Sequence, residues 1–159
     1  MKVAIVMGGK SDYPVVERAE AILKEFNVAY ETRIISAHRT PRIAEEFASK
    51  AEENGIEVII AAAGKAAHLG GVLAAYTAMP IIGLPIKSST LDGLDSLLSI
   101  VQMPKGVPVA TVAIDGAENA ALLAVQILSV KYPQLRAKMK SYKIKMEEDI
   151  VKQDQELNR

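Results

Sequence analysis

Residues 2–8, KVAIVMG, form a continuous apolar run that is rich in β-branched side chains. Such a run is typical of a strand that is buried on both faces of a parallel sheet. Four further segments with strand patterns follow at residues 28–35, 57–64, 80–86 and 107–114, and helical patterns separate them. Strand and helix alternate five times, which predicts an α/β fold with three layers and a doubly wound, parallel, five-stranded sheet.

The segments between these runs carry signals for the ends of helices. Ser11 or Asp12 can cap the first helix and Thr40 the second, and a proline follows in the first turn of each. Asp115 and Glu118 have the spacing of a capping box before the fifth helix. That helix continues as NAALLAVQILSV, which is apolar nearly all round and is therefore expected to be deeply buried.

The C-terminal segment, residues 133–159, is predicted to be an extra helix that is charged except for one narrow apolar stripe. The stripe comprises Leu135, Met139, Tyr142, Met146 and Ile150. It either packs on its own domain or reaches a neighbouring subunit, and its seam-like width leaves both possibilities open. We expect a single catalytic domain over residues 1–159, with this helix used in subunit contacts.

The composition argues against several classes of protein. The 159-residue chain has 19 basic and 19 acidic residues, so no net field draws it to nucleic acid or to a membrane surface. It has no cysteine and no tryptophan, which argues against disulfides, thiolate metal sites and stacking platforms for single-stranded nucleic acid. No apolar run is long enough to span a bilayer and no signal-peptide pattern is present, which predicts a cytoplasmic location.

Polar and glycine-rich segments follow four of the predicted strands. In chain order they read GGKSD, SAHRTP, AGKAAHLGG and KSSTLDG. Ligands of an open parallel sheet bind outside the carboxyl ends of its strands, so these segments are expected to meet in one site. Both histidines of the chain, His38 and His68, belong to this set.

The first of these segments has features of a phosphate-binding loop. Gly9 lets the backbone approach a ligand, Ser11 offers a hydroxyl donor, and Asp12 can accept hydrogen bonds from sugar hydroxyls. The same residues are also typical of a tight turn followed by a helix cap. Taken alone, the segment favours the turn, because a short glycine motif is a weak signal.

The second segment places a fixed cation beside a titratable ring. Arg39 can hold a phosphate through two hydrogen bonds, and His38 can carry a proton near neutral pH. Their position at a strand end favours a binding group and a catalytic group over residues that cap a carbonyl or fill a crevice. His68 lies among alanine and glycine, where a lone histidine is more often structural. Two histidines without cysteines or a ligand spacing predict no metal site.

Four motifs are more specific together than any one alone: VMGGKSD, SAHRTP, AGKAAHLGG and GLDSLLSIVQMPKGVPVATVAI. In this order and spacing they resemble the class I N5-carboxyaminoimidazole ribonucleotide mutases of purine biosynthesis, also called the catalytic subunit of phosphoribosylaminoimidazole carboxylase. The resemblance runs from residue 2 to about residue 140. It implies a flavodoxin-like domain that assembles as an octamer. It also implies an isomerase that moves a carboxylate from the exocyclic nitrogen of an aminoimidazole ribonucleotide to carbon 4 of its ring.

The resemblance implies roles for individual residues as well. The ribonucleotide is the small-molecule partner, and no metal, ATP, biotin or other cofactor takes part. Ser11, Asp12 and Arg39 are implied to bind the phosphate and the ribose. His38 is implied to shuttle the proton. Three residues are implied to line the end of the pocket that holds the carboxylate and the imidazole, namely Ala37, His68 and Leu69.

Three positions depart from the pattern of that family. Gly9 stands where the family usually has serine, while Lys65 and Gly70 stand where it usually has glycine and proline. Lys65 is expected to add a cation for the phosphate or the carboxylate, and Gly70 to make its loop more mobile. These two departures lean toward the related class II enzymes, which carboxylate aminoimidazole ribonucleotide directly with carbon dioxide. SAHRTP and AAH follow class I, so the mutase is the main prediction and direct carboxylation the alternative.

A remote alternative is a non-enzymatic, flavodoxin-like nucleotide-binding module, such as a response-regulator receiver or an FMN-binding electron carrier. A receiver needs a carboxylate at the end of the third strand, where this chain reads AAAGK. An FMN carrier is expected to have a phosphate loop rich in serine and threonine, and aromatic residues beside the flavin. The segment GGKSD and the lack of tryptophan do not match that pattern.

Overall fold

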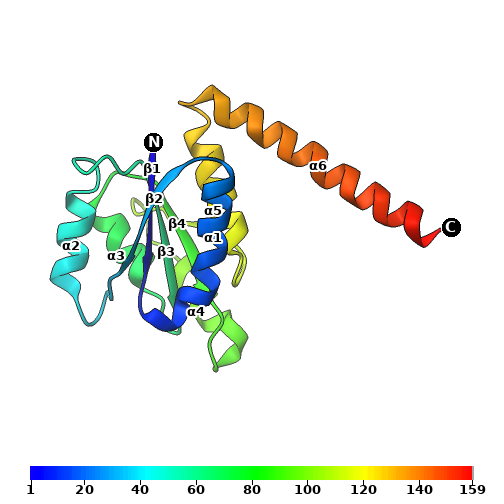
Figure 1. Ribbon diagram of the computed structural model, residues 1–159. Helices are drawn as coiled ribbons and strands as arrows, with labels where there is room; N and C mark the ends of the chain where they lie inside the picture. The colour runs from blue at the N-terminus through cyan, green and yellow to red at the C-terminus, as the bar shows by residue number, and fades with distance from the viewer. Residues whose placement is uncertain (159) are drawn as a thin grey trace.

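The computed structural model describes residues 1–158 and shows an α/β domain built on a five-stranded sheet (Figure 1). The strands are β1 (Lys2–Met7), β2 (Ala29–Ile34), β3 (Val58–Gly64), β4 (Ile81–Ile86) and β5 (Ala110–Thr111). All neighbouring strands are parallel, in the order β2-β1-β3-β4-β5. This is the strand order of flavodoxin-like folds. The predicted fold class is confirmed.

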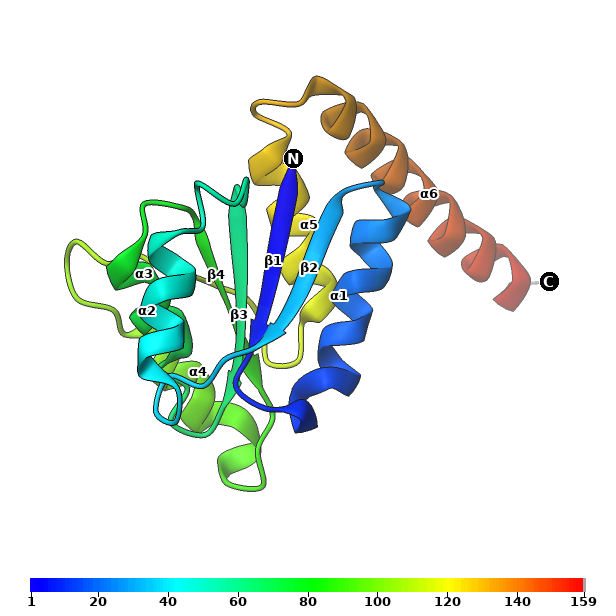
Figure 2. The same cartoon turned by 60° about the vertical axis from the view of Figure 1, so that its left-hand side comes forward.

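Helices cover both faces of the sheet and complete the three layers (Figures 1 and 2). The helices on one face are α1 (Tyr13–Glu25) and α5 (Ala117–Leu128). Those on the other face are α2 (Pro41–Ser49), α3 (Leu69–Tyr76) and α4 (Leu94–Val101). Two short 3₁₀ turns, η1 (Lys10–Asp12) and η2 (Leu91–Gly93), precede α1 and α4, and α6 (Pro133–Leu157) ends the described chain.

The central strand β1 explains the apolar run with which the sequence begins. Val3 and Ile5 point into the core beneath α1 and α5, whereas Ala4 and Val6 point into the core beneath α2 and α3. All four side chains are fully buried. Because alternate residues of a strand face opposite sides, a strand covered on both sides must be apolar throughout.

The edge strand β5 is much shorter than predicted. Residues 107–114 were expected to form it, but only Ala110 and Thr111 pair with β4. Pro108 has no backbone N–H to donate, which disfavours sheet pairing at the start of the run. Two further bonds continue the contact beyond the strand, from the Val112 N–H to the Gly83 carbonyl at 3.0 Å and from the Asp115 N–H to the Pro85 carbonyl at 2.8 Å.

The predicted side-chain caps are wrong. The N-terminal ends of α1, α2 and α5 have no capping hydrogen bond from a side chain. Thr40 instead closes a turn with Ser36, whose backbone N–H donates to Thr40 Oγ1 at 2.9 Å. The carboxylate of Asp115 accepts the backbone N–H of Lys87 at 2.8 Å. Asp115 therefore ties the end of β4 to the start of α5 instead of capping a helix.

The helix α5 is buried along one face and not all round, which corrects the expectation from its composition. Its fully buried residues are Ala117, Ala120, Ala121, Ala124 and Val125. Leu122, Leu123 and Ile127 are only partly buried at the edge of the core. Part of the apolar surface of α5 is therefore open beside α6.

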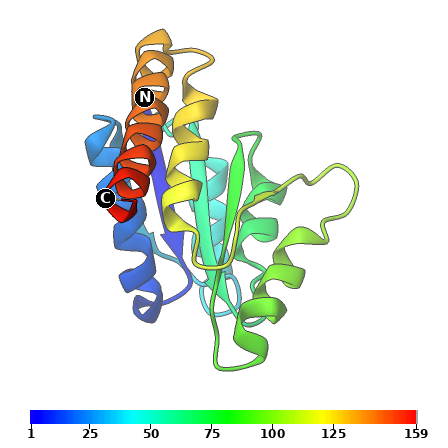
Figure 3. The ribbon, with the colours of Figure 1, turned by 90° about the vertical axis from the view of Figure 1, so that its right-hand side faces the viewer.

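The C-terminal helix α6 begins on the domain and then extends away from it (Figures 1 and 2), and Figure 3 views the molecule from the side toward which it projects. Leu135 and Met139 are buried, and the ring of Tyr142 lies 5.7 Å from that of Phe26, between centroids. Beyond them the predicted stripe is open to solvent, since Met146 is 53% and Ile150 64% exposed. With 25 residues, α6 is about 38 Å long. Within residues 1–158, every helix is too short or too polar to cross a membrane.

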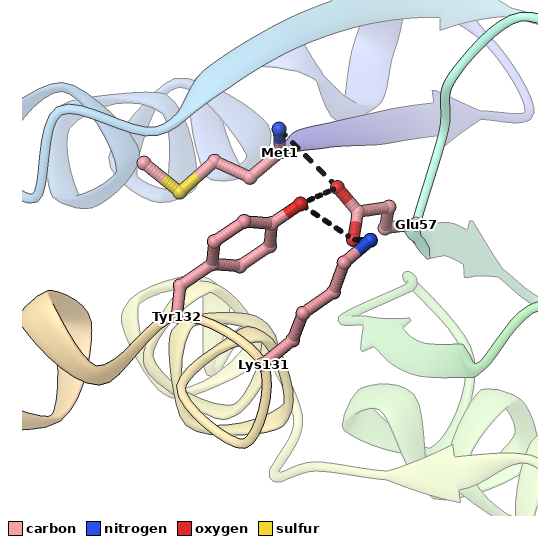
Figure 4. A network of polar contacts seen from close by, with 4 residues as sticks. All are labelled: Met1, Glu57, Lys131 and Tyr132. Atoms are coloured by element: carbon pink, nitrogen blue, oxygen red, sulfur yellow. Dashed lines mark hydrogen bonds and ion pairs between the residues drawn. The ribbon is translucent and has the colours of Figure 1, made fainter.

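Glu57, at the start of β3, joins three parts of the chain (Figure 4). Its carboxylate accepts the Tyr132 hydroxyl at 2.8 Å, and it pairs with Lys131 Nζ at 3.1 Å and the Met1 amino group at 3.2 Å. Partial burial raises the pKa of Glu57, but the hydrogen bonds from these three donors outweigh it and leave the pKa below its ordinary value. The charged carboxylate thus holds the linker between α5 and α6 against the amino-terminal edge of the sheet.

Replacing Glu57 by glutamine is expected to lower the free energy of unfolding by about 1 kcal/mol at pH 7, because the amide keeps the tyrosine bond but loses both cations. A lowered native pKa contributes stability above the unfolded value of 4.5, and that contribution is lost as the pH falls through the native pKa. Urea unfolding at pH 7 and pH 3 checks both points. The exposed Glu52→Gln variant is the control, and an equal loss at both pH values contradicts the assignment.

Candidate active site

Four strand ends surround one cavity of about 640 Å³. The loops after β1, β2, β3 and β4 form its walls, at the carboxyl edge of the sheet where the chain order reverses between β1 and β3. This edge is the general ligand-binding position of doubly wound folds. All nine site residues predicted from the sequence line the cavity, namely Gly9, Ser11, Asp12, Ala37, His38, Arg39, Lys65, His68 and Leu69.

Arg39 is held at the junction of the β1 and β2 loops. Its Nη2 donates to the Gly8 carbonyl at 2.7 Å, and its Nε and backbone N–H each donate to Ser36 Oγ at 3.2 Å. A Cβ built on Gly9 would lie 3.5 Å from Arg39 Nη2, which is an ordinary contact. The loop therefore has room for a larger residue, and Gly9 leaves that space beside the guanidinium open.

Asp12 belongs to the segment after β1, which also contains Gly8 and Gly9. Ser11 Oγ donates to Asp12 Oδ1 at 3.3 Å. Burial raises the pKa of Asp12 above its ordinary value, although the hydrogen bonds from Ser11 and from the Gly9 backbone and the charge of Arg39 oppose the rise. A half-buried carboxylate with spare lone pairs can accept hydrogen bonds from the hydroxyls of a sugar.

The two histidines are in direct contact. His38 Nε2 lies 2.9 Å from His68 Nδ1, and the rings meet edge to face with centroids 5.1 Å apart. A hydrogen bond needs one donor and one acceptor, so only one of these two nitrogens carries a proton when the bond is formed. The protonation and tautomer of one ring thus constrain those of the other. The sequence alone favoured a structural His68, whereas the structure places it at the centre of the site.

Lys65 has a backbone φ of 56°, in the left-handed region. Glycine adopts this region without a steric penalty, whereas a lysine is strained there. The Lys65 side chain is exposed at the rim of the cavity. Gly70, in contrast, lies buried in the first turn of α3, with a hypothetical Cβ 3.5 Å from Val109 Cγ1. Gly70 therefore belongs to a packed helix end and not to the loop, which corrects our expectation of a mobile loop residue.

Replacing Lys65 by glycine is expected to hold or raise the stability of the fold, by up to about 1 kcal/mol, because it relieves the left-handed conformation. It is also expected to weaken the binding of an anionic ligand a few-fold, since an exposed lysine contributes a screened attraction. Calorimetric titration at low salt measures the second effect. Asparagine at position 65 is the matched variant, because it tolerates the same φ without a charge. Unchanged affinity in both variants excludes Lys65 from ligand binding.

Sequence reasoning did not single out three polar side chains that the structure adds to the cavity wall. They are Ser36, Lys87 and Ser88. Ser36 orients Arg39, while Lys87 and Ser88 begin the segment KSSTLDG after β4. The sequence shows that this segment is polar and follows a strand, and its position was the one signal that it lies near the site. Nothing in the sequence distinguished its two residues that face the cavity from the five that do not.

The strand order and the cavity at the carboxyl edge define a doubly wound α/β protein with a small-molecule site. Residues 2–149 match the family described as AIR carboxylase, and the chain belongs to that family. Within residues 1–158 no group of three or more histidine, aspartate and glutamate side chains is arranged to hold a metal ion.

Curated relatives match most of the chain. A protein of Pyrococcus abyssi named N5-carboxyaminoimidazole ribonucleotide mutase is 64% identical over 142 residues, which are 89% of this chain and 82% of the relative. Proteins of the same name from Thermotoga maritima and Mycobacterium tuberculosis are 56% and 52% identical over 98% and 99% of this chain, and over 91% of each relative. The crystal structure of Treponema denticola PurE superposes with a TM-score of 0.91 at 31% identity and covers 99% of both chains.

Proposed function

We propose that this protein is an N5-carboxyaminoimidazole ribonucleotide mutase. The observation that carries the proposal is the convergence of nine residues from three separate loops on one cavity, in a chain 50–64% identical to curated proteins of that name. Those names favour the mutase over direct carboxylation, the alternative that Lys65 and Gly70 had kept open. The reaction is an isomerisation in which a carboxylate leaves the exocyclic nitrogen and joins carbon 4 of the imidazole ring.

The positions of the side chains support a division of the cavity. Arg39 with Ser11 is proposed to bind the phosphate, and Asp12 the ribose hydroxyls. His38, His68 and the neighbouring Ala37 and Leu69 then surround the base and the carboxylate. The small side chains there are suited to a confined space in which carbon dioxide, once released from nitrogen, stays beside the nucleophilic ring carbon.

The proton balance fits a single shuttle group. Breaking the nitrogen–carbon bond leaves the exocyclic nitrogen to gain a proton, and forming the new carbon–carbon bond leaves carbon 4 to lose one. The imidazole of one histidine side chain can supply the first proton and take up the second, so no net acid or base is consumed. The position of His38, in the same turn as Arg39 and in contact with His68, supports this proposed role.

The test is an assay without ATP that offers either N5-carboxyaminoimidazole ribonucleotide or aminoimidazole ribonucleotide with bicarbonate. Rapid conversion of the first substrate, with slow conversion of the second, is the expected result. Preferential use of the second substrate makes the protein a direct carboxylase. Conversion of neither substrate contradicts the assignment to this reaction.

A homo-oligomer, with the octamer implied by the resemblance, is also part of the proposal. The second half of α6 leaves apolar side chains in solvent, namely Ile144, Met146, Ile150, Val151 and Leu157. A groove of about 360 Å³ between α5 and α6 is lined by Leu122, Met139 and Tyr142 among others. Apolar surface of this extent suits a contact with another subunit. A cytoplasmic location follows from the proposed enzyme class and stands as part of the same proposal.

Truncation after Lys143 is expected to dissociate the oligomer while the domain stays folded, since Leu135, Met139 and Tyr142 remain. Light scattering of the full chain and of the shortened chain, with circular dichroism of both, measures the effect. A full-length chain that is monomeric at micromolar concentration contradicts the proposed assembly. An unchanged mass after truncation moves the contact to another surface.

A further inference from the structure

The cavity contains more positive charge than a single phosphate requires. Three cationic side chains line it, Arg39, Lys65 and Lys87, and Asp12 is the one carboxylate among its lining residues. The proposed substrate and product each carry two anionic groups, a phosphate at one end and a carboxylate at the other. A pocket for such a molecule needs cationic groups at two separated places.

Of the four strand ends that surround the cavity, those of Arg39 and Lys87 are the farthest apart. In the order β2-β1-β3-β4, Arg39 follows β2 and Lys87 follows β4, so their strand ends are three spacings, or about 14 Å, apart. Gly64 of β3 pairs in register with Ile86 of β4, so Lys65 and Lys87 each follow the last paired residue of two neighbouring strands, and both line the cavity. The two lysines therefore share the wall farther from the guanidinium.

The backbone of Lys87 is fixed although its ammonium group is exposed. Its N–H donates to Asp115 Oδ1 at 2.8 Å, and the hydroxyl of the next residue, Ser88, lies 3.0 Å from an oxygen of Asp95. These contacts anchor the strand end to α5 and to α4. The backbone of Lys87 is thus held in place while its long side chain stays flexible, so its ammonium group can reach a ligand group at the rim of the cavity.

The ammonium group of Lys87 forms an ion pair with the carboxylate of Asp92. Lys87 Nζ lies 3.2 Å from Asp92 Oδ1, with the side chains 59% and 88% exposed. The turn that allows this has three consecutive positive φ angles, 52° at Leu91, 52° at Asp92 and 94° at Gly93. A Cβ on Gly93 would lie 3.1 Å from the Lys87 Cα, so the turn folds closely over the lysine. An ion pair this exposed is weak and easily exchanged for another anion.

We propose that Lys87 binds the carboxylate group of the substrate and product, and that Asp92 pairs with Lys87 until the ligand arrives. This proposal rests on the mutase activity proposed above. Lys87 is a binding residue for the carboxylate end, whereas Arg39 serves the phosphate end. Asp92 is a placeholder carboxylate whose ion pair is replaced by one with the ligand.

The test compares two nucleotides that differ in the carboxylate alone. Calorimetric titrations use 4-carboxy-5-aminoimidazole ribonucleotide and 5-aminoimidazole ribonucleotide, with the wild type, Lys87→Met and Lys87→Arg. Lys87→Met is expected to weaken the carboxylated ligand about fivefold to tenfold at low salt, because an exposed charge pair contributes modestly. Its effect on the ligand without the carboxylate is expected to be less than about twofold. Lys87→Arg retains the charge and most of the affinity.

Controls separate this proposal from a structural effect and from the proposed function. Lys50→Met removes an equally exposed lysine that pairs with Glu46 at 2.8 Å on α2, and it leaves both affinities unchanged. Asp92→Asn binds the carboxylated ligand at least as tightly as the wild type, and weaker binding overturns the role of Asp92. Equal losses for both ligands in Lys87→Met, or no loss for either, overturn the role of Lys87. Wild-type turnover of the N5-carboxylated substrate is measured in parallel, and its absence overturns the mutase itself.

Discussion

Replacing His38 by asparagine is expected to lower turnover by about 10²–10⁴-fold, which is the usual contribution of a positioned acid–base group. Asparagine keeps a hydrogen-bonding side chain but cannot carry a proton at neutral pH. The affinity for the nucleotide should change far less, because Arg39, Ser11 and Asp12 are untouched. Turnover assays and calorimetric titrations of the same preparation measure the two effects separately.

His68 provides the comparison for this experiment. It contacts His38 at 2.9 Å, so His68→Asn alters the partner of the proton carrier without removing the carrier. We expect a smaller loss of turnover than in His38→Asn, since the proton carrier remains and only its hydrogen-bond partner changes. Near-normal turnover in His38→Asn, or a loss of binding as large as its loss of turnover, contradicts the proposed role of His38.

Much of the fold could be predicted because its signals are local. Buried parallel strands are apolar over their whole length, as Val3 to Val6 illustrate, and helices between them repeat with a period of 3.6 residues. The rule that parallel strand ends meet at one edge then predicts that four polar segments lie together. The same reasoning placed His38 and Arg39 correctly at the cavity.

The errors concern residues whose partners are distant in the chain. Asp115 and Glu118 have the spacing of a capping box, yet Asp115 binds the Lys87 backbone and Glu118 pairs with Arg18 at 3.3 Å, 100 residues away. In the sequence, Glu57 is an ordinary residue at the start of a strand. Its ion pair with Lys131 is a tertiary contact that local spacing does not predict. Local spacing describes which bonds a side chain can make nearby, but tertiary contacts decide which of them form.

The direct contact between His38 and His68 is of the same kind. The two residues are 30 positions apart and belong to loops after strands that are not neighbours, because β1 lies between β2 and β3. Strand order had to be known before these rings could be placed side by side. The resemblance implied that both line the pocket, and the structure adds that their ring nitrogens lie within hydrogen-bond distance.

Replacing Arg39 by alanine is expected to weaken the binding of every phosphorylated ligand by about 10- to 100-fold, because a charge-assisted pair of hydrogen bonds to phosphate contributes about 1.5–3 kcal/mol. The dephosphorylated nucleoside should lose little affinity. Titration of the nucleotide, the nucleoside and inorganic phosphate separates a phosphate contact from a general disturbance of the loop. Arg42→Ala is the matched control, since Arg42 lies exposed on α2 outside the cavity lining.

Arg39 also forms hydrogen bonds within the protein. A loss of ligand binding in Arg39→Ala therefore has two causes to distinguish, a lost phosphate contact and a disturbed loop. Its guanidinium bonds to the Gly8 carbonyl and to Ser36 Oγ, and both bonds disappear with the side chain. Ser36→Ala removes one internal bond and leaves the cation, so it tests whether the orientation of Arg39 matters by itself. If Ser36→Ala keeps phosphate affinity while Arg39→Ala loses it, the charge acts directly on the ligand. If nucleotide and nucleoside weaken equally in Arg39→Ala, the arginine supports the loop and the phosphate is bound elsewhere in the cavity.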